Sequence, residues 1–170
     1  MWWHSVLPLP DILCSLTPLT HLDPDIWVDA SSSWGIGLVV GPLWAAWHLL
    51  PGWNDGDCDI GWAEKIALEL AVHWLRDRGY HDADVIVHSD NSGVIGAFWK
   101  GRSRNASCNT SISHVSIALS CSNLALLPIF VPSVENHADP ISRGCLSSLN
   151  SHITDVIDLP DPLHLFLVQV

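Results

Sequence analysis

Alternating apolar and polar residues predict three short strands in the first third of the chain, at residues 25–31, 35–40 and 43–49. In the first of them, Ile26 and Val28 alternate with Trp27 and Asp29. A period of two places Asp29 on the sheet face opposite the two aliphatic residues. Because aspartate has poor strand propensity and is costly to bury as an ion, this position calls for a functional reason such as metal binding. A tight Gly-Pro turn at residues 41–42 then predicts an antiparallel meander.

A helical period replaces the alternation between Gly61 and Arg78, where the sequence predicts its clearest helix. The apolar stripe of this helix is Ala63, Ile66, Ala67, Leu70 and Trp74. Two glutamates, Glu64 and Glu69, lie roughly 140° apart around the helix axis. We expect Glu69 on the solvent side as an ion-pair partner, and Glu64 at the boundary of the buried face. The structural alternative for Glu64 is a capping glutamate in the first turn.

The second half of the chain alternates predicted strands with predicted helices. A nearly continuous apolar run at residues 85–88 indicates a strand buried on both faces, central and parallel to an earlier strand. The other predicted elements are helices over 92–99 and after Ser107, a strand over 124–131, and a final helix near Asp139. Together they predict an α/β fold in which helices flank a mixed sheet of five strands, three antiparallel and then parallel.

The composition indicates one domain with extensions. The chain has 170 residues, of which 48% are hydrophobic, so it can bury a substantial core. We expect a domain over residues 23–150, an N-terminal extension over 1–22, and a tail over 151–170 to which we assign no role. The extension mixes tryptophans and leucines with prolines and shows no sustained period, as in a piece cut from a longer polyprotein.

Charge and cysteine content weigh against several classes of protein. The formal net charge is −11, from 7 Lys and Arg against 18 Asp and Glu, which argues against a large electrostatic footprint on nucleic acid. Five cysteines without a Cys-x-x-Cys pair indicate neither a disulfide framework nor a zinc ribbon. Without a basic leader or a stretch of about eighteen apolar residues, we expect an intracellular protein, cytoplasmic or nuclear, with no membrane span.

Four acidic residues lie at the edges of predicted elements, from which they can converge on one metal site: Asp29, Glu64, Asp90 and Asp139. Asp90 follows a predicted buried strand, and ligand sites gather at the carboxyl ends of such strands. Asp90 and Asp139 have a structural alternative, because each also suits the N-cap of a following helix. The acids between residues 55 and 59 alternate as in a calcium loop, but the glutamate at the twelfth position is missing.

Each of these acids is embedded in a characteristic run of residues. The runs are Val28-Asp29-Ala30-Ser31 with Trp34-Gly35-Ile36-Gly37, then Trp62 to Leu70, His88-Ser89-Asp90-Asn91, and Val131-Pro132-Ser133 with Asn136 to Gly144. In this order they resemble the ribonuclease H domain of reverse transcriptases, in the form found in fungal retrotransposon polyproteins. The resemblance covers roughly residues 23–146 and implies a ribonuclease H-like fold. Residues 1–22 look like the tail of the region that joins polymerase to ribonuclease H.

The resemblance also implies a set of catalytic residues and a cofactor. The family's catalytic, metal-binding positions fall on Asp29, Glu64, Asp90 and Asp139. In the family, Asp29 would bridge two ions, Glu64 and Asp90 would complete one site, and Asp139 would complete the other. Two Mg²⁺ ions about 3.5–4 Å apart, or Mn²⁺ in their place, would then activate a water and stabilise the departing oxygen.

The substrate implied by the resemblance is an RNA–DNA hybrid, recognised through the 2′-hydroxyls of one strand. A basic run of Lys100, Arg102 and Arg104 holds three of the seven basic residues and lies where some family members carry a substrate-binding projection. Taken alone, such a run is more often a solvated loop. We also expect Asn91 and Ser31 to contact the substrate.

The sequence therefore predicts a magnesium-dependent endonuclease that cuts the RNA strand of hybrids, with the polymerase domain of the same polyprotein as its partner. One departure from the family concerns the mobile histidine of many members, because His137 sits too near Asp139 to be equated with it. The alternative is a catalytically silent ribonuclease H-like module that packs against a partner. A transposase or integrase shares the fold class, but that family uses Glu as the acid of its last helix.

Overall fold

The computed structural model describes residues 19–146 and 151–170. Most of the predicted N-terminal extension falls on residues 1–18 and so lies outside the described residues. The strands are β1 (Thr20–Ala30), β2 (Gly35–Val40), β3 (Leu43–Leu49), β4 (Ala83–Ser89), β5 (Leu124–Phe130), β6 (Ser151–His152) and β7 (Leu167–Gln169). The α-helices are α2 (Ile60–Asp77), α3 (Ser92–Lys100), α4 (Ala106–Cys121) and α5 (Asp139–Ser142), and the 3₁₀ helices are η1 (Ser133–Glu135) and η2 (Asp161–Leu165).

The strands form one mixed sheet in the order β5-β4-β1-β2-β3-β6, with β7 also paired to β3. Strands β1, β2 and β3 are antiparallel neighbours, whereas β4 pairs parallel with β1 and β5 pairs parallel with β4. This arrangement is the ribonuclease H-like α/β fold, so the predicted fold class is confirmed. The five predicted strands are β1 to β5, and the bounds predicted for β2 and β3 agree with the structure.

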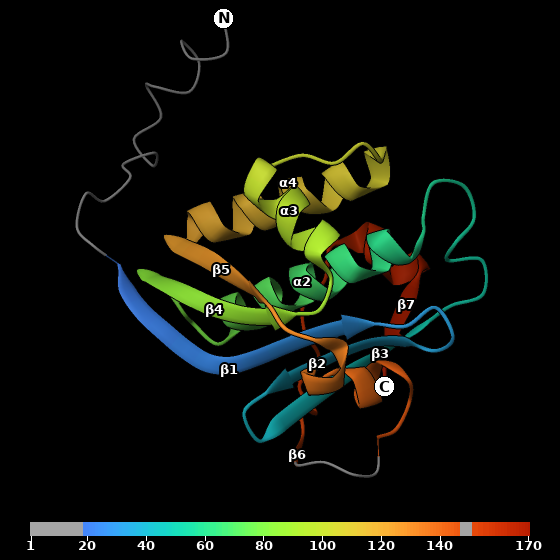
Figure 1. Ribbon diagram of the computed structural model, residues 1–170, viewed down its shortest axis with the longest axis horizontal. Helices are drawn as coiled ribbons and strands as arrows, with labels where there is room; N and C mark the ends of the chain where they lie inside the picture. The colour runs from blue at the N-terminus through green and yellow to red at the C-terminus, as the bar shows by residue number, and fades with distance from the viewer. Residues whose placement is uncertain (1–18, 147–150) are drawn as a thin grey trace, which may run out of the picture.

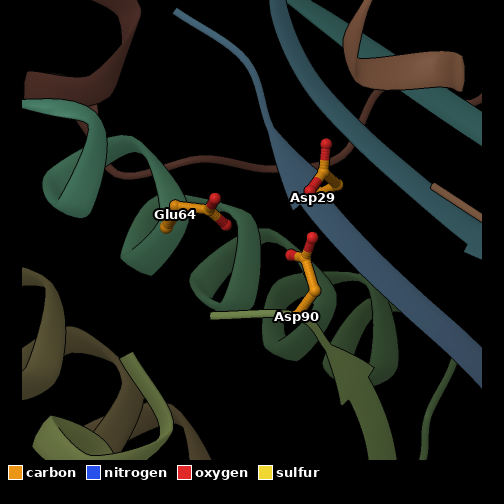
Figure 2. Close-up of side chains that lie close together, drawn as sticks. All are labelled: Asp29, Glu64 and Asp90. Atoms are coloured by element: carbon orange, nitrogen blue, oxygen red, sulfur yellow. The ribbon is translucent and has the colours of Figure 1, made fainter. Parts of the chain in front are cut away.

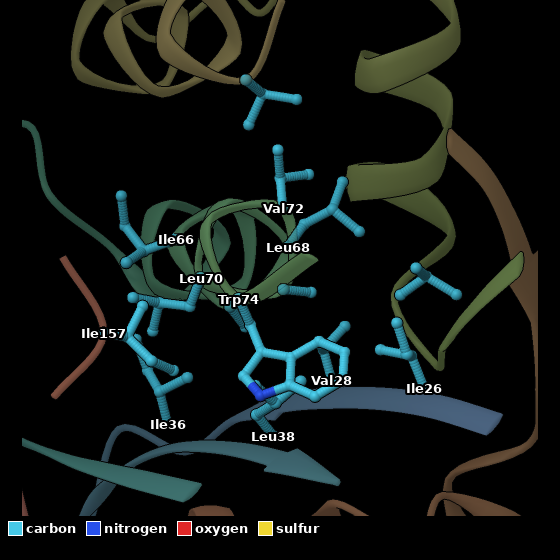
Figure 3. Packing of buried hydrophobic residues seen from close by; sticks show 14 of the residues in the cluster. Ile26, Val28, Ile36, Leu38, Ile66, Leu68, Leu70, Val72, Trp74 and Ile157 are labelled. Atoms are coloured by element: carbon cyan, nitrogen blue, oxygen red, sulfur yellow. The ribbon is translucent and has the colours of Figure 1, made fainter. Parts of the chain in front are cut away.

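The sheet is covered by helices on both faces (Figure 1). Helices α2, α3 and α4 lie over one face, where the main core forms between α2 and the inward side chains of β1 and β2. Figure 3 shows Ile26, Val28 and Leu38 of the sheet facing α2. The short helix α5 packs on the opposite face, where Ile141 joins a smaller cluster around β2 and β3. Two apolar layers thus fix the sheet between α2 and α5.

Strand β1 begins five residues before the predicted strand. Its first part pairs with β4 from Thr20, and the register then shifts between Leu22 and Ile26. Asp25 lies in this irregularity with a positive φ of 61°. Pro24 just before it interrupts the alternation that the sequence pattern depends on, because proline cannot donate to a sheet ladder. A β-bulge therefore joins the two parts of β1, which the sequence pattern shows as separate segments.

The tail over residues 151–170 adds to the sheet. Strand β6 pairs with the start of β3 and β7 pairs with its end, as in the register of Leu49 with Leu167. The buried tail residues are Ile153, Ile157, Leu159, Leu163 and Leu167, and all of them belong to the main core. Two ion pairs, Arg76 with Asp158 and Arg78 with Asp155, also join α2 to the tail.

No helix in the described part of the chain is both long enough and apolar enough to cross a membrane.

Candidate active site

Asp29 lies near the end of β1, on the face that carries α5, and its side chain is only 4% exposed. Its partner in the register of β2 is Gly37. A Cβ atom at Gly37 would meet the backbone oxygen of Ala138 at 2.7 Å and the backbone nitrogen of Ser142 at 2.8 Å. Glycine at this position therefore lets α5 pack close enough for the Ser142 hydroxyl to reach the Asp29 carboxylate.

Two donors from the α5 region hold that carboxylate. The Ser142 hydroxyl donates to Oδ2 of Asp29, and Nδ2 of Asn136 donates to Oδ1 at 3.3 Å. The same Asn136 nitrogen donates to the backbone oxygen of Val28 at 3.1 Å. These bonds fix the orientation of a buried acid whose position in the sheet is already set by the strand register.

Glu64 and Asp90 complete a compact group with Asp29 (Figure 2). Glu64 projects from α2 with 7% exposure, and Asp90 follows the last residue of β4. One carboxylate oxygen from each of the three side chains lies within 4.8 Å of the others. Figure 2 shows the three side chains converging from β1, α2 and the end of β4. We call this group the acid triad.

The capping alternatives for these acids are wrong, because other residues hold the N-cap positions and the first turn of α2 contains no acidic residue. The N-cap of α2 is Asp59, whose carboxylate accepts from the Trp62 amide at 2.8 Å. The N-cap of α3 is Asn91, the residue after Asp90. Helix α5 begins at Asp139 itself, and its N-cap position is Ala138. N-terminal helix capping therefore does not explain why acids occupy these positions.

Burial and repulsion from neighbouring carboxylates disfavour ionisation of Asp29 and Glu64. Desolvation, followed by the charges of Asp90 and Asp139, raises the pKa of Asp29 from 3.8 to about 7, although the Ser142 hydroxyl lowers it in part. Desolvation, followed by the charges of Asp29 and Asp90, raises the pKa of Glu64 from 4.5 to about 8. Without a compensating cation, Asp29 and Glu64 therefore keep part of their protons at neutral pH.

Asp139 lies close enough for its charge to raise the pKa of Asp29, but it is not part of the acid triad. Both of its carboxylate oxygens accept hydrogen bonds from Arg143. Nε of Arg143 lies 2.9 Å from Oδ1 and 3.0 Å from Oδ2 of Asp139, and Nη2 lies 2.8 Å from Oδ1. Three of the four predicted acids therefore come together directly. The fourth lies beside them in an ion pair with an exposed arginine.

The acid triad fits a divalent cation with a preference for oxygen ligands. It offers only carboxylate oxygens, which hard cations such as Mg²⁺ favour. One of them, Oε2 of Glu64, is buried and has no hydrogen-bond partner among the described residues. A cation at this point would satisfy that oxygen and offset both the desolvation and the repulsion that raise the pKa values of Asp29 and Glu64.

Of the predicted substrate-contacting residues, Asn91 and Ser31 lie one and two residues from members of the acid triad, whereas the basic run lies at the far end of α3. Asn91 hydrogen-bonds to Glu64, which partly offsets the rise in its pKa, and Ser31 is buried with its hydroxyl 2.8 Å from that of Ser33. The basic run, namely Lys100, Arg102 and Arg104, lines a hollow of about 590 Å³ that continues along α3. His137 stacks on the ring of Trp27, with 4.1 Å between ring centroids.

The expectation for Glu69 is wrong. Glu69 is fully buried, and His114 of α4 contacts Oε1 through its Nδ1 at 2.8 Å. The helical period of α2 identifies only the side that faces the sheet, whereas α4 and η2 cover the other side. Glu69 is therefore a buried polar residue rather than a solvated ion-pair partner.

Sequence reasoning assigned no role to the residues that hold the acids, which are Asn136, Ser142 and Arg143. Ser142 and Arg143 lie three and four residues after Asp139, a spacing that places them beside it on one helical turn. That spacing is a usable signal for the Asp139–Arg143 pair. Contacts to Asp29 more than 100 residues away leave no such signal in a single sequence.

No protein-family model matches the chain, and no curated protein matches it. A similar solved structure is RNase H1 from the halophilic archaeon Halobacterium salinarum NRC-1, at 17% sequence identity and a TM-score of 0.48. The match covers 71% of this chain and 92% of that one. The strand order and the strand directions are what identify the fold of this chain.

Proposed function

We propose that the chain is a metal-dependent endonuclease that hydrolyses the RNA strand of RNA–DNA hybrids. The observation that carries this proposal is the convergence of Asp29, Glu64 and Asp90 from β1, α2 and β4 of a ribonuclease H-like sheet. We further propose a reverse-transcriptase polyprotein of a retrotransposon as its source, with the polymerase domain as its partner. The residues that surround the four acids in the sequence support this origin.

Mg²⁺ is the proposed cofactor, in two ions, with Mn²⁺ as a substitute. Bound cations would activate a water for in-line attack and neutralise the charge that develops on the departing oxygen. Asp29, Glu64 and Asp90 would hold them, with Asp139 as the fourth ligand. Ser142 and Asn136 keep the Asp29 carboxylate in one orientation. Arg143 holds Asp139 at the rim through a bidentate pair, which keeps its charge next to the acid triad.

The substrate is proposed to run along α3. The residues of α3 that line the hollow beside it are Ser92, Gly93, Gly96, Ala97 and Lys100, which form one face of the helix. This face begins two residues after Asp90 and ends at Lys100, about 12 Å farther along the axis. Small side chains let a sugar-phosphate backbone approach closely, and Arg102 and Arg104 supply positive charge at the far end.

Replacement of Lys100, Arg102 and Arg104 together by Ala is expected to weaken hybrid binding and flatten its salt dependence. With so few basic residues in the chain, phosphate binding depends heavily on this run. Each phosphate that the protein no longer neutralises makes the slope of log K against log salt shallower by about one. Binding isotherms at several salt concentrations measure this, and the melting temperature serves as the control because the basic run lies at the surface. An unchanged slope would place the substrate elsewhere on the surface.

The purified chain is expected to degrade the RNA of a labelled RNA–DNA hybrid when Mg²⁺ or Mn²⁺ is present, and to leave double-stranded DNA intact. Chelation by EDTA should stop the reaction, because the acid triad consists of carboxylates that need a cation to neutralise them. Gel analysis of both substrates measures this. Hybrid binding without cleavage at any metal concentration would favour the catalytically silent module, for which the net charge of −11 is the supporting observation.

A further inference from the structure

A second cluster of ligand-type side chains lies in the interface between α2 and α4, built around Glu69. Glu69 is 0% exposed, and His73, one helical turn later on α2, is 3% exposed. His114 reaches the same carboxylate from α4 and is 28% exposed. None of the three belongs to the acid triad, and no role in the proposed hydrolysis uses them.

The polar atoms of this cluster are poorly satisfied. Oε1 of Glu69 lies 2.8 Å from Nδ1 of His114 and 3.5 Å from Nε2 of His73. Oε2 of Glu69 and both ring nitrogens of His73 are buried without a hydrogen-bond partner among the described residues. A buried polar atom that is left unpaired destabilises the fold, so three at one place call for a ligand.

A cavity gives access to two of the three side chains, Glu69 and His114. It has a volume of about 150 Å³ and lies between α2, α4 and η2. Glu69 and His114 line it together with Cys58, Trp62 and Pro162. The volume is several times that of a water molecule, which occupies about 30 Å³ in the liquid, so an ion with a coordinated water fits.

We propose that Glu69, His73 and His114 form a binding site for a divalent transition-metal ion, with Zn²⁺ as the natural occupant, that joins α2 to α4. Two imidazoles and one carboxylate are an established ligand set for zinc, with the fourth position left to water. Ligand atoms about 2.1 Å from a tetrahedral ion lie roughly 3.4 Å apart, close to the separation of 3.5 Å between Oε1 of Glu69 and Nε2 of His73.

The ligand set separates this site chemically from the acid triad. Imidazole nitrogen suits Zn²⁺ and other borderline ions, whereas the all-oxygen acid triad suits Mg²⁺. The ligand atoms around Glu69 are less tightly gathered than those of the acid triad. Because Oε1 of Glu69 and Nδ1 of His114 are only 2.8 Å apart, closer than two ligands of one tetrahedral ion, closure on the ion requires His114, which is partly exposed and lines the cavity, to turn. The site is independent of the proposed nuclease activity.

The test uses the full chain with Asp29→Asn and Asp90→Asn, so that the acid triad no longer binds metal. At a free Zn²⁺ concentration about 100 times Kd, this background should melt about 5–10 °C higher than without Zn²⁺. Co²⁺ in place of Zn²⁺ should give the visible absorption of a tetrahedral nitrogen-containing site. Adding His114→Ala should weaken binding at least about 100-fold, because loss of an outer-shell partner alone costs about 10–100-fold.

The matched control is His81→Ala in the same background, since His81 is exposed and contacts only Asp82 among the ion pairs described. This variant should keep the full response to Zn²⁺ and Co²⁺. Glu69→Gln preserves the size of the side chain and should lose both responses, which covers the case that a histidine variant misfolds. Equal responses of the background and of its His114→Ala form, or no response of the background, would overturn the proposal in favour of an ordered water.

Discussion

Asp29→Asn and Asp90→Asn are each expected to reduce hydrolysis of the hybrid by at least about 10³-fold. Each substitution removes one carboxylate charge from the acid triad and preserves the size of the side chain. Cations stabilise the transition state for phosphodiester hydrolysis by several kcal/mol, and about 4 kcal/mol corresponds to a thousandfold change in rate. Single-turnover cleavage of labelled RNA at saturating Mg²⁺ measures the loss directly.

Glu64→Gln should behave in the same way, because Glu64 is the third member of the acid triad. The matched control is Asp55→Asn, which removes one negative charge from an exposed loop and should retain wild-type activity. The comparison separates loss of a metal ligand from a general change in net charge. Cleavage at wild-type rates by both Asp29→Asn and Asp90→Asn would contradict the enzyme assignment.

The metal-free protein is expected to lose stability as the pH rises from about 5 to 9. The pKa values of Asp29 and Glu64 rise on folding to about 7 and about 8, so the folded state binds more protons than the unfolded state above pH 4. Stability from these two groups is therefore complete in acid and is lost as the pH passes their folded values. Each of the two shifts, of about three units, corresponds to about 4 kcal/mol, and because the two carboxyls repel each other their contributions do not simply add, so the melting temperature should fall by at least about 10 °C.

Asp29→Asn should flatten this dependence, since it removes one of the two titrating groups and the charge that repels Glu64. Mg²⁺ should stabilise the wild type more at pH 9 than at pH 5, because the cation competes with protons for the same oxygens. Melting curves across pH, with and without Mg²⁺, measure both effects, and Asp55→Asn should follow the wild type. Parallel curves for the wild type and Asp29→Asn would mean that the raised pKa values do not exist.

Local patterns were sufficient to predict the central sheet. The bounds of β2 and β3 follow from the runs of apolar residues between turn signals, and Asp29 is placed by a period of two. The acids themselves were singled out by their places at the edges of predicted elements together with the family resemblance, and the structure brings three of them, Asp29, Glu64 and Asp90, together. These residues are positioned by their own elements.

What the sequence could not supply are the contacts between distant segments. Glu69 looked solvated because the helical period of α2 does not reveal that α4 and η2 cover its second side. Strands β6 and β7 have two and three residues, too few to show any period. Ser142 donates to Asp29 across 113 positions, a pairing that depends on where α5 docks rather than on any local spacing.

The pairing of β6 and β7 with β3 also bears on how the molecule behaves in a crowded solution. The outer edge of β3 would otherwise present free amide and carbonyl groups beside the apolar side chains of Leu43, Trp47 and Leu49. Open edges of this kind are the places where sheets of separate molecules join into aggregates. Because β6 and β7 occupy that edge, the tail shields the chain from self-association through β3.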